Sequence, residues 1–303
     1  MNQIALKCAK PLHDKNPPIV PLRHYGRWVA AAVLLCLLLS FGESLFTNPR
    51  FGWDVVWKYL FDSSILAGLI TTIWLTVASM AIGILLGTLL ATMRLSENRL
   101  LSGFAATYTW LFRGSPLLVQ LIFWYNLAAL YPKISLNLPF GPTLFSFDAN
   151  SYITIYVAAL LGLSLNEGAY MSEIVRSGLN AVPKGQREAA QALGMSSYRI
   201  FFKITLPQAM PVIVPPAGNE LIGMLKTSSL VSVVAMQELL YSAQLIYTVN
   251  FRTIPLLIVA SIWYLALTTI LSIGQHFIER HFNKSRSLKS RTTSPSEESN
   301  GHD

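Results

Sequence analysis

Six long apolar runs are the feature that most restricts the fold of this chain. A bilayer core about 30 Å thick requires about 20 apolar residues per helix. Runs of about this length occupy residues 28–46, 64–93, 116–131, 152–171, 212–236 and 255–277. Of the 303 residues, 52% are hydrophobic and only 13% are charged, which is about half the charge of a typical soluble domain. We therefore expect a chain that lives in a bilayer.

The runs predict helices rather than strands. Membrane strands alternate apolar and polar residues over about ten positions, whereas "AAVLLCLLLS" at 31–40 and "MAIGILLGTLL" at 80–90 are apolar on every face. We predict an all-α, polytopic bundle of about six transmembrane helices. Two runs are irregular: the third is short because a break at "RGSP" (113–116) sets its start, and the fifth contains Glu220 and Lys226.

The distribution of Lys and Arg predicts the orientation. Loops on one side of the membrane carry basic residues throughout 1–27, 94–113, 176–203 and 280–291, whereas loops on the other side carry only Arg50, Lys58, Lys133 and Arg252. Because basic loops stay in the cytoplasm, we expect both termini there. The net charge of +8 then reflects loops that face anionic lipid, and nucleic acid is not an expected partner.

The two ends of the chain carry segments outside the main set of spans. Residues 1–27 are expected to form a cytoplasmic tail and 28–46 an extra membrane helix; a signal peptide is the alternative, although no small-residue cleavage site follows. Residues 281–303 are polar and Ser-rich, which predicts a disordered cytoplasmic tail. Cys8 and Cys36 fall in the first tail and the first helix, so neither a disulfide framework nor a metal site is expected.

A basic segment between the fourth and fifth runs has its own helical order. In "EAAQALGMSSYRIFFKITLP" (188–207), helix formers lead to Gly194, which can adopt the left-handed conformation that closes a helix. Ser196 or Ser197 can cap a second helix that is expected to end at Pro207. A plain connector between bundle helices takes about two to eight residues. This longer elbow, with an apolar stripe, predicts a partner beyond the membrane.

These residues resemble the EAA loop of bacterial ABC importer permeases. The matching positions are Glu188, Ala189, Ala190, Gly194, Ile204, Leu206 and Pro207. Further segments, "FRGSPLLVQLIFWY" (112–125), "AYMSEIVRSGLNAVPKGQREAAQALG" (169–194) and "LPQAMPVIVPPAGNELIGMLKTSSLVSVV" (206–234), are similar to the polar amino acid subfamily, which includes histidine and glutamine importer permeases. The resemblance covers residues 64–280.

The resemblance implies a division of labour between subunits. The elbow would dock on a dimer of ABC ATPase subunits, with the matching positions forming the contact and Gly194 setting the bend. ATP and Mg would bind to that partner, because this chain has no G-x-x-x-x-G-K-[ST] phosphate loop. A second permease, identical or similar, would complete the pore, and a periplasmic or extracellular solute-binding protein would deliver the substrate, a small polar amino acid or close derivative. The chain itself would sit in the bacterial inner membrane.

Polar groups inside the spans mark a hypothetical substrate path, because ionisable residues are costly in a membrane. The residues singled out are Glu167, Asn219, Glu220, Lys226 and Ser228. Pro215, Pro216 and Gly218 are expected to break the fifth helix and release a helix N-terminus toward a substrate carboxylate; a simple kink is the alternative. Glu173 and Arg176, three apart on a helix, are expected to form a supporting ion pair.

Two departures from the family pattern and two other functions are considered. Ser115 stands where relatives usually carry Thr, and Thr227 where they often carry Asp or Asn, which weakens substrate inference at that point. "GLS" at 162–164 could suggest a serine hydrolase, but the histidines lie in the tails or at the end of the last run, so no base is available. An ion-coupled secondary amino acid carrier would explain the buried charges but not the long elbow.

Overall fold

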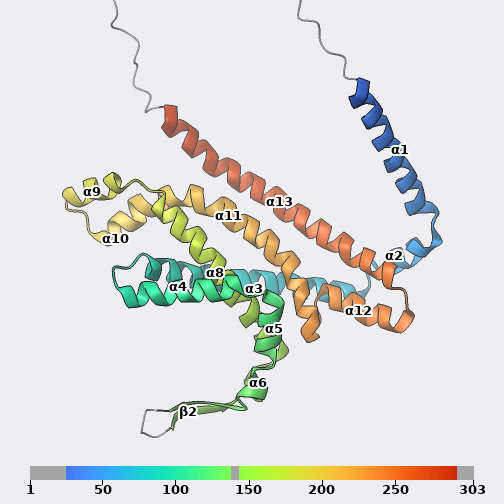
Figure 1. Cartoon of the computed structure of the whole chain (residues 1–303), viewed down its shortest axis with the longest axis horizontal. Coiled ribbons are helices and arrows are strands. Elements are labelled where there is room, and N and C mark those ends of the chain that lie inside the picture. Colours follow the sequence, from blue (N-terminus) through green and yellow to red (C-terminus); the bar gives the residue numbers. More distant parts are fainter. Residues whose placement is uncertain (1–24, 138–142, 292–303) are drawn as a thin grey trace, which may run out of the picture. The chain divides into compact units, whose positions relative to one another are not determined.

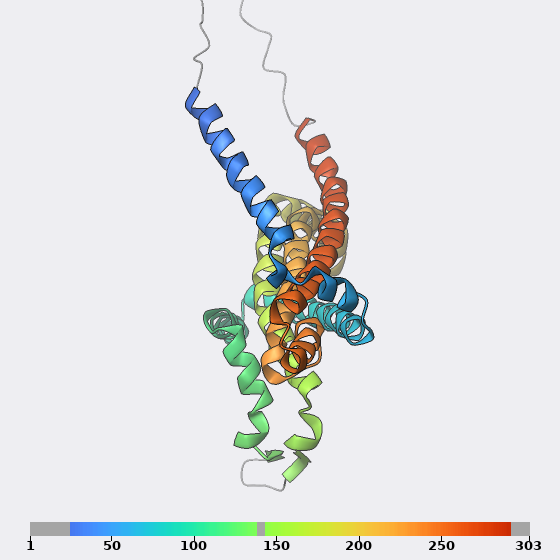
Figure 2. The ribbon, with the colours of Figure 1, turned by 90° about the vertical axis from the view of Figure 1, so that its right-hand side faces the viewer.

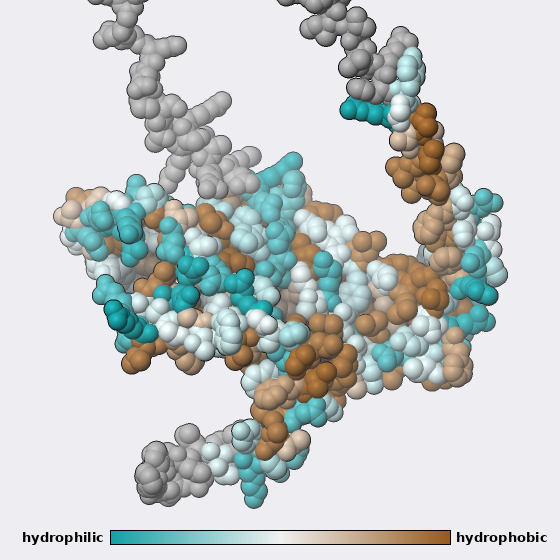
Figure 3. Space-filling model, in the orientation of Figure 1, coloured by the Kyte–Doolittle hydropathy of each residue, from teal (hydrophilic) through white to brown (hydrophobic). Residues whose placement is uncertain are grey.

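The computed structural model describes residues 25–137 and 143–291. The chain divides into two units at Phe51 and Gly52, and each is described by itself. The first contains the helix α1 (Tyr25–Thr47) and the short turn η1 (Pro49–Phe51). Every residue of α1 is solvent-accessible within this chain, the helix is long and apolar enough to cross a membrane, and the middle of the face shown in Figure 3 is hydrophobic. This is the pattern of a membrane-spanning helix.

The second unit contains the remaining helices and one hairpin (Figure 1). In chain order its elements are α2 (Trp53–Tyr59), α3 (Ser63–Arg94), α4 (Arg99–Gly114), α5 (Leu117–Tyr125), α6 (Leu127–Leu130), β1 (Lys133–Asn137), β2 (Thr143–Asp148), α7 (Ala149–Tyr152), α8 (Ile155–Asn180), α9 (Lys184–Ala192), α10 (Ser197–Ile200), η2 (Phe201–Thr205), α11 (Leu206–Thr227), η3 (Ser228–Val234), α12 (Leu239–Asn250) and α13 (Thr253–Arg291).

Four helical segments within the described residues are long and apolar enough to cross a membrane. They are Tyr25–Thr47, Ser63–Arg94, Ser197–Val234 and Thr253–Phe282. The expected fourth span corresponds to α8, which is long enough but more polar because other helices surround it. The third is a different case. Here the nine residues of α5 follow α4 across the "RGSP" break, and the two helices run in different directions (Figures 1 and 2).

The helices α3 and α8 pack side by side in parallel and form the centre of the second unit. Gly83 and Gly87 of α3 let the backbones approach closely: a Cβ at Gly83 would lie 2.5 Å from Glu167 Cγ, and one at Gly87 would lie 2.5 Å from Met171 Cβ. This Gly-x-x-x-Gly spacing is the common solution for helix contact in membranes, where small residues allow dense packing.

Three buried clusters follow one another along α3. At its start, Ile65 and Leu69 pack with residues of α2, α12 and α13. In its middle, Leu75 packs with α5, α8 and η3. Toward its end, Met80 and Ala91 pack with α8 and the first part of α11. The core is therefore built along one helix, and the other elements lie around it.

The prolines of the fifth span do not break it. The segment from Ser197 to Val234 is continuous, and α11 contains Pro211, Pro215 and Pro216 in its interior. The expected release of a helix N-terminus at Pro215 is therefore wrong, and so is the expected helix end at Pro207. The irregular turns lie elsewhere, in the π-helical η2 and the 3-10-helical η3. Extra residues per turn in η2 precede Pro207 and allow the helix to continue past it.

Three further features depart from the sequence expectations. The hairpin of β1 and β2 pairs Lys133 with Asp148 and extends from the bundle (Figures 1 and 2), a small addition to a helical membrane fold that is otherwise as predicted. The short helix α12 packs against the start of α13. The helix α13 continues to Arg291. Residues 281–291 were expected to be disordered, and they are helical instead. Most of the predicted N-terminal tail, 1–24, and residues 292–303 lie outside the described residues.

A buried acidic residue joins three helices at the start of α12. The carboxylate of Glu238 accepts hydrogen bonds from the backbone N–H groups of Leu240 and Tyr241 and from Tyr264 Oη at 2.7 Å. The backbone N–H of Leu239 donates to Thr72 Oγ1 of α3. Burial raises the pKa of the Glu238 carboxyl, and the hydrogen bonds it accepts partly offset that rise.

Candidate functional site

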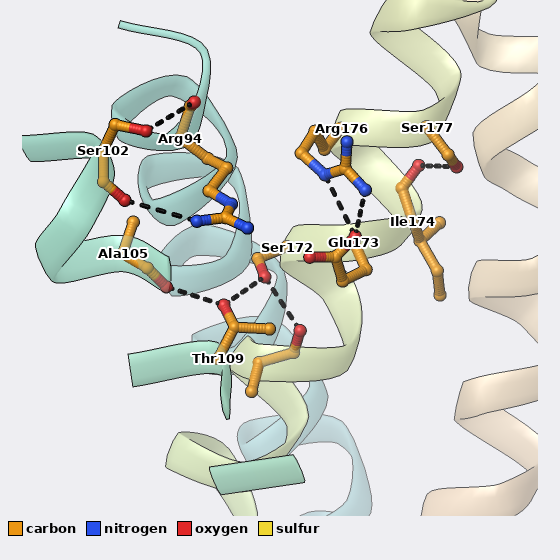
Figure 4. A network of polar contacts seen from close by, with 10 residues as sticks. Arg94, Ser102, Ala105, Thr109, Ser172, Glu173, Ile174, Arg176 and Ser177 are labelled. Atoms are coloured by element: carbon orange, nitrogen blue, oxygen red, sulfur yellow. Dashed lines mark hydrogen bonds and ion pairs between the residues drawn. The ribbon is translucent and has the colours of Figure 1, made fainter. Parts of the chain in front are cut away.

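The junction of α4 and α5 lies beside the middle of α8. Tyr108 Oη donates to the carbonyl of Leu165 at 2.8 Å, and the hydroxyls of Thr109 and Ser172 are 3.2 Å apart (Figure 4). Because α8 extends from Ile155 to Asn180, residues 165–172 are near its midpoint. Arg113, near the end of α4, is exposed within this chain.

Side-chain amides stabilise the break at this junction. Pro116 has no N–H, so the carbonyl of Phe112 loses its helical partner. Gln120 Nε2 and Asn166 Nδ2 donate to this carbonyl, at 2.9 Å and 2.8 Å. Gln120 also donates to Ser115 Oγ at 2.8 Å. Non-helical backbone is tolerated in a membrane when protein groups satisfy it, and here the break is tied to α8.

Three charged residues come together around this junction. The guanidinium of Arg113 lies over the ring of Tyr170, 5.1 Å from its centroid. Arg113 also interacts electrostatically with Glu220 of α11, which in turn interacts with Glu167 of α8. Glu167 is only 4% exposed, and among the described residues its Oε1 atom has no hydrogen-bond partner. We call Arg113, Glu167 and Glu220 the charge cluster.

The other residues of the hypothetical path have more ordinary surroundings. Asn219 is exposed and its Oδ1 accepts from Gln275 Nε2 of α13 at 3.0 Å. Lys226 is exposed at the end of α11. Ser228 is buried, but its hydroxyl donates to the carbonyl of Leu225 at 2.7 Å and so satisfies the helix end. The predicted ion pair of Glu173 and Arg176 is confirmed, with Arg176 Nε 3.0 Å from Glu173 Oε2 (Figure 4).

Sequence reasoning missed Arg113 and Tyr170 as members of this site. The available signal was the scarcity of charge in this part of the sequence. Between Arg99 and Tyr131, Arg113 is the only charged residue apart from Arg99 itself. An ionisable residue inside a span is a functional candidate, but the third run was predicted to begin at Pro116, so Arg113 was counted with the basic loop.

The elbow between α8 and α11 has the predicted bend. Gly194 has a φ of +73°. Its N–H donates to the carbonyl of Gln191 at 2.9 Å, and the N–H of Met195 donates to that of Ala190 at 3.2 Å. This is the Schellman motif that ends a helix with a left-handed residue. The expectation for Gly194 is therefore confirmed as geometry.

The matching positions of the elbow divide into an outer and an inner set. Glu188, Ala189, Gly194 and Pro207 are exposed. Ala190 is only 3% exposed, Leu206 lines a cavity inside the bundle, and Ile204 is half-buried. Ala190 was expected to contact the ATPase directly. Because it is buried, its small side chain instead allows α9 and η2 to pack closely. Large apolar side chains also face outward: Leu193 is 82% and Tyr198 72% exposed.

Comparison with known proteins assigns the family. Residues 83–284 match the model of the "Binding-protein-dependent transport system inner membrane component", which is two thirds of the chain. The chain belongs to this family. It is a membrane permease of the ABC class rather than an enzyme, and a permease of this class works with an ATPase and a binding protein. The family assignment replaces the alternative of a secondary carrier.

Named relatives and a solved structure agree with the assignment. The arginine transport system permease protein ArgU of Corynebacterium glutamicum is 47% identical over 278 residues, 91% of this chain and 84% of ArgU. The L-cystine transport system permease protein TcyB of Bacillus subtilis is 35% identical over 233 residues, 77% of this chain and 92% of TcyB. A crystal structure of an amino acid ABC transporter with histidines superposes with a TM-score of 0.61 at 33% identity, covering 72% of this chain and 94% of that one.

Proposed function

We propose that this chain is the permease subunit of an ABC importer for a cationic amino acid, with L-arginine as the favoured substrate. The observation that carries the proposal is the charge cluster, in which Glu167 is buried with an unpartnered oxygen. A buried polar group without a partner costs free energy, and a ligand that supplies the partner recovers it. Relatives at 47% and 36% identity are named as arginine permeases.

The charges of the cluster are opposite to those of arginine. The substrate carries a guanidinium, an ammonium and a carboxylate; the cluster offers two carboxylates, Glu167 and Glu220, and one guanidinium, Arg113. A guanidinium pairs well with a carboxylate through charge-assisted hydrogen bonds. A neutral amino acid would leave one carboxylate unmatched, and a polar site rejects a ligand that leaves its buried groups unpaired. Asn219, Lys226 and Ser228 then line other parts of the path along α11.

Coupling to ATP hydrolysis is proposed to pass through the elbow. A partner ATPase dimer would bind ATP and Mg and contact the outer set, Glu188, Ala189, Gly194 and Pro207, while Ala190, Ile204 and Leu206 hold the elbow to the bundle. The helical segment from Ser197 to Val234 is continuous, which supports direct transmission of movement from the elbow to the charge cluster. A second permease, identical or similar, would complete the pore, with both termini in the cytoplasm and a solute-binding protein on the opposite side.

Substrate recognition is tested with Glu167→Gln and Arg113→Gln in reconstituted transporter. We expect Glu167→Gln to weaken arginine transport by roughly tenfold or more while transport of a neutral amino acid is less affected. Arg113→Gln should weaken both equally, because every amino acid has the α-carboxylate. Glu220→Gln should resemble Glu167→Gln. Wild-type arginine affinity and rate in all three variants would refute the charge cluster as the substrate site.

Coupling is tested with Gly194→Val. A Cβ at Gly194 meets no atom of the described residues within 4 Å, so the variant has room to fold, but a β-branched residue at positive φ is strained by about 1–2 kcal/mol. The elbow should shift, and uptake should fall while the ATPase of the complex continues. A bulky residue at Glu188 should act similarly by blocking the contact. Undiminished uptake in both variants would overturn the assignment of the elbow.

A further inference from the structure

Two cavities adjoin each other on the elbow side of the second unit. The larger, about 640 Å³, lies between α3, α8, α11 and α13. The smaller, about 410 Å³, lies between the ends of α3 and α8 and the elbow segments α9, α10 and η2. Thr92, Leu179 and Phe201 line both cavities. The two compartments therefore share one wall, although they differ in chemistry.

The larger compartment is suited to a hydrocarbon chain. Nearly all of its lining is apolar, with side chains such as Met80, Met171 and Ile213. Along α3 it extends from Met80 to Thr92, about 18 Å at the helical rise of about 1.5 Å per residue. This length is close to half of a bilayer core of about 30 Å. On α8 it is lined by Met171, Val175 and Leu179, in the half of the helix nearer the elbow.

The smaller compartment is suited to an anionic headgroup. Its lining residues include Arg187, Asn180, Gln191 and Ser197, and no acidic residue is among its described lining. Arginine binds phosphate oxygens through paired N–H donors. An amphiphile could therefore place an apolar chain in the larger compartment and a phosphate in the smaller one.

We propose that the two compartments together bind one anionic phospholipid from the leaflet on the elbow side. An acyl chain occupies the larger compartment and the phosphate contacts Arg187. Arg187 belongs to α9, while Phe201 belongs to the helical segment that continues into α11. The bound lipid therefore bridges the elbow and the bundle and restrains their relative movement. This inference is independent of the transported substrate.

The test uses the purified full chain and phosphatidylglycerol with a photoreactive group in one acyl chain. Arg187→Gln removes the headgroup partner. Gly274→Leu fills the larger compartment, which Gly274 lines and where a Cβ meets no atom within 4 Å. Lys184→Gln on α9 and Gly223→Leu on α11 are the matched controls, since neither residue lines either compartment. Thermal unfolding of each variant shows whether it is folded.

Crosslinks in the wild-type chain are expected on α3, α11 and α13 at lining residues, and phosphatidylcholine with the same group should give few of them. Arg187→Gln should lower this labelling by roughly tenfold, the effect of losing a charge-assisted hydrogen bond. Gly274→Leu should lower it because the new side chain occupies the space of the acyl chain, whereas the controls should keep it. Equal labelling by the two lipids, or unchanged labelling in both folded test variants, would show only the general lipid shell and overturn the proposal.

Discussion

Replacing Gly87 with alanine is expected to force α3 and α8 apart. A Cβ at this position would lie 2.5 Å from Met171 Cβ and 2.9 Å from both the Met171 carbonyl carbon and the Ser172 nitrogen. Two of these three atoms belong to the backbone of α8, which cannot rotate away as a side chain can. Since non-bonded carbons pack at about 3.5–4.0 Å, the two helices must separate by roughly 1 Å.

The magnitude follows from comparison with a second glycine. Overpacking of this kind costs about 1–3 kcal/mol, while alanine gains about 1 kcal/mol of helix propensity over glycine. Gly103 of α4 is the matched control, because within the part of the chain that the structure describes a Cβ there meets no atom within 4 Å, and alanine gains the same propensity. The difference between the two variants isolates the contact and should be about 2 kcal/mol, or roughly 4–8 °C in Tm.

The assay is thermal unfolding of the purified chain in detergent, followed by helical circular dichroism, for the wild type and both variants. We expect Gly87→Ala to unfold below Gly103→Ala by the stated interval. If Gly87→Ala unfolded at or above the temperature of Gly103→Ala, the close contact of α3 with α8 at this point would be refuted, and with it the packing that positions Glu167.

The remaining predictions concern the buried carboxyl of Glu238 and the outer face of the elbow. Tyr264→Phe removes a donor to Glu238 and should cost about 1–3 kcal/mol. Burial raises the folded pKa of Glu238, so the protonated carboxyl favours folding, and this contribution is lost as pH rises through that pKa. The hydrogen bond from Tyr264 lowers the pKa of Glu238, so the pKa should be higher in Tyr264→Phe. The difference in Tm between the wild type and this variant should therefore grow from pH 5 to pH 8; a constant difference would contradict this. Leu193→Asp should abolish co-purification of the ATPase, whereas Val249→Asp, on α12 and 80% exposed, should not; retention by both variants would exclude Leu193 from the contact.

The sequence predicts local features well where a residue acts alone. Gly194 ends α9 because only a left-handed residue fits there, and the pair Glu173 and Arg176 forms because three residues on a helix bring the side chains together. These effects depend on neighbours along the chain and so can be read from it. The long apolar runs likewise specify helices, because the bilayer accepts little else.

Features that depend on tertiary partners could not be predicted in the same way. Pro116 and Pro215 look alike in sequence, but the first interrupts a helix and the second lies inside one. The carbonyl freed by Pro116 is captured by Gln120 and Asn166, and the latter comes from a different helix. Arg113 was missed for the same reason, since its partners Tyr170 and Glu220 come from α8 and α11. The Gly83 and Gly87 spacing was readable, but its partner helix was not.

The most direct test of the central claim is arginine uptake into proteoliposomes that contain this chain, its co-purifying ATPase and its binding protein. The account predicts uptake that requires ATP inside the vesicles, is competed by other cationic amino acids, and is lost in Glu167→Gln. Uptake that proceeds without ATP or ATPase, driven by an ion gradient alone, would contradict it.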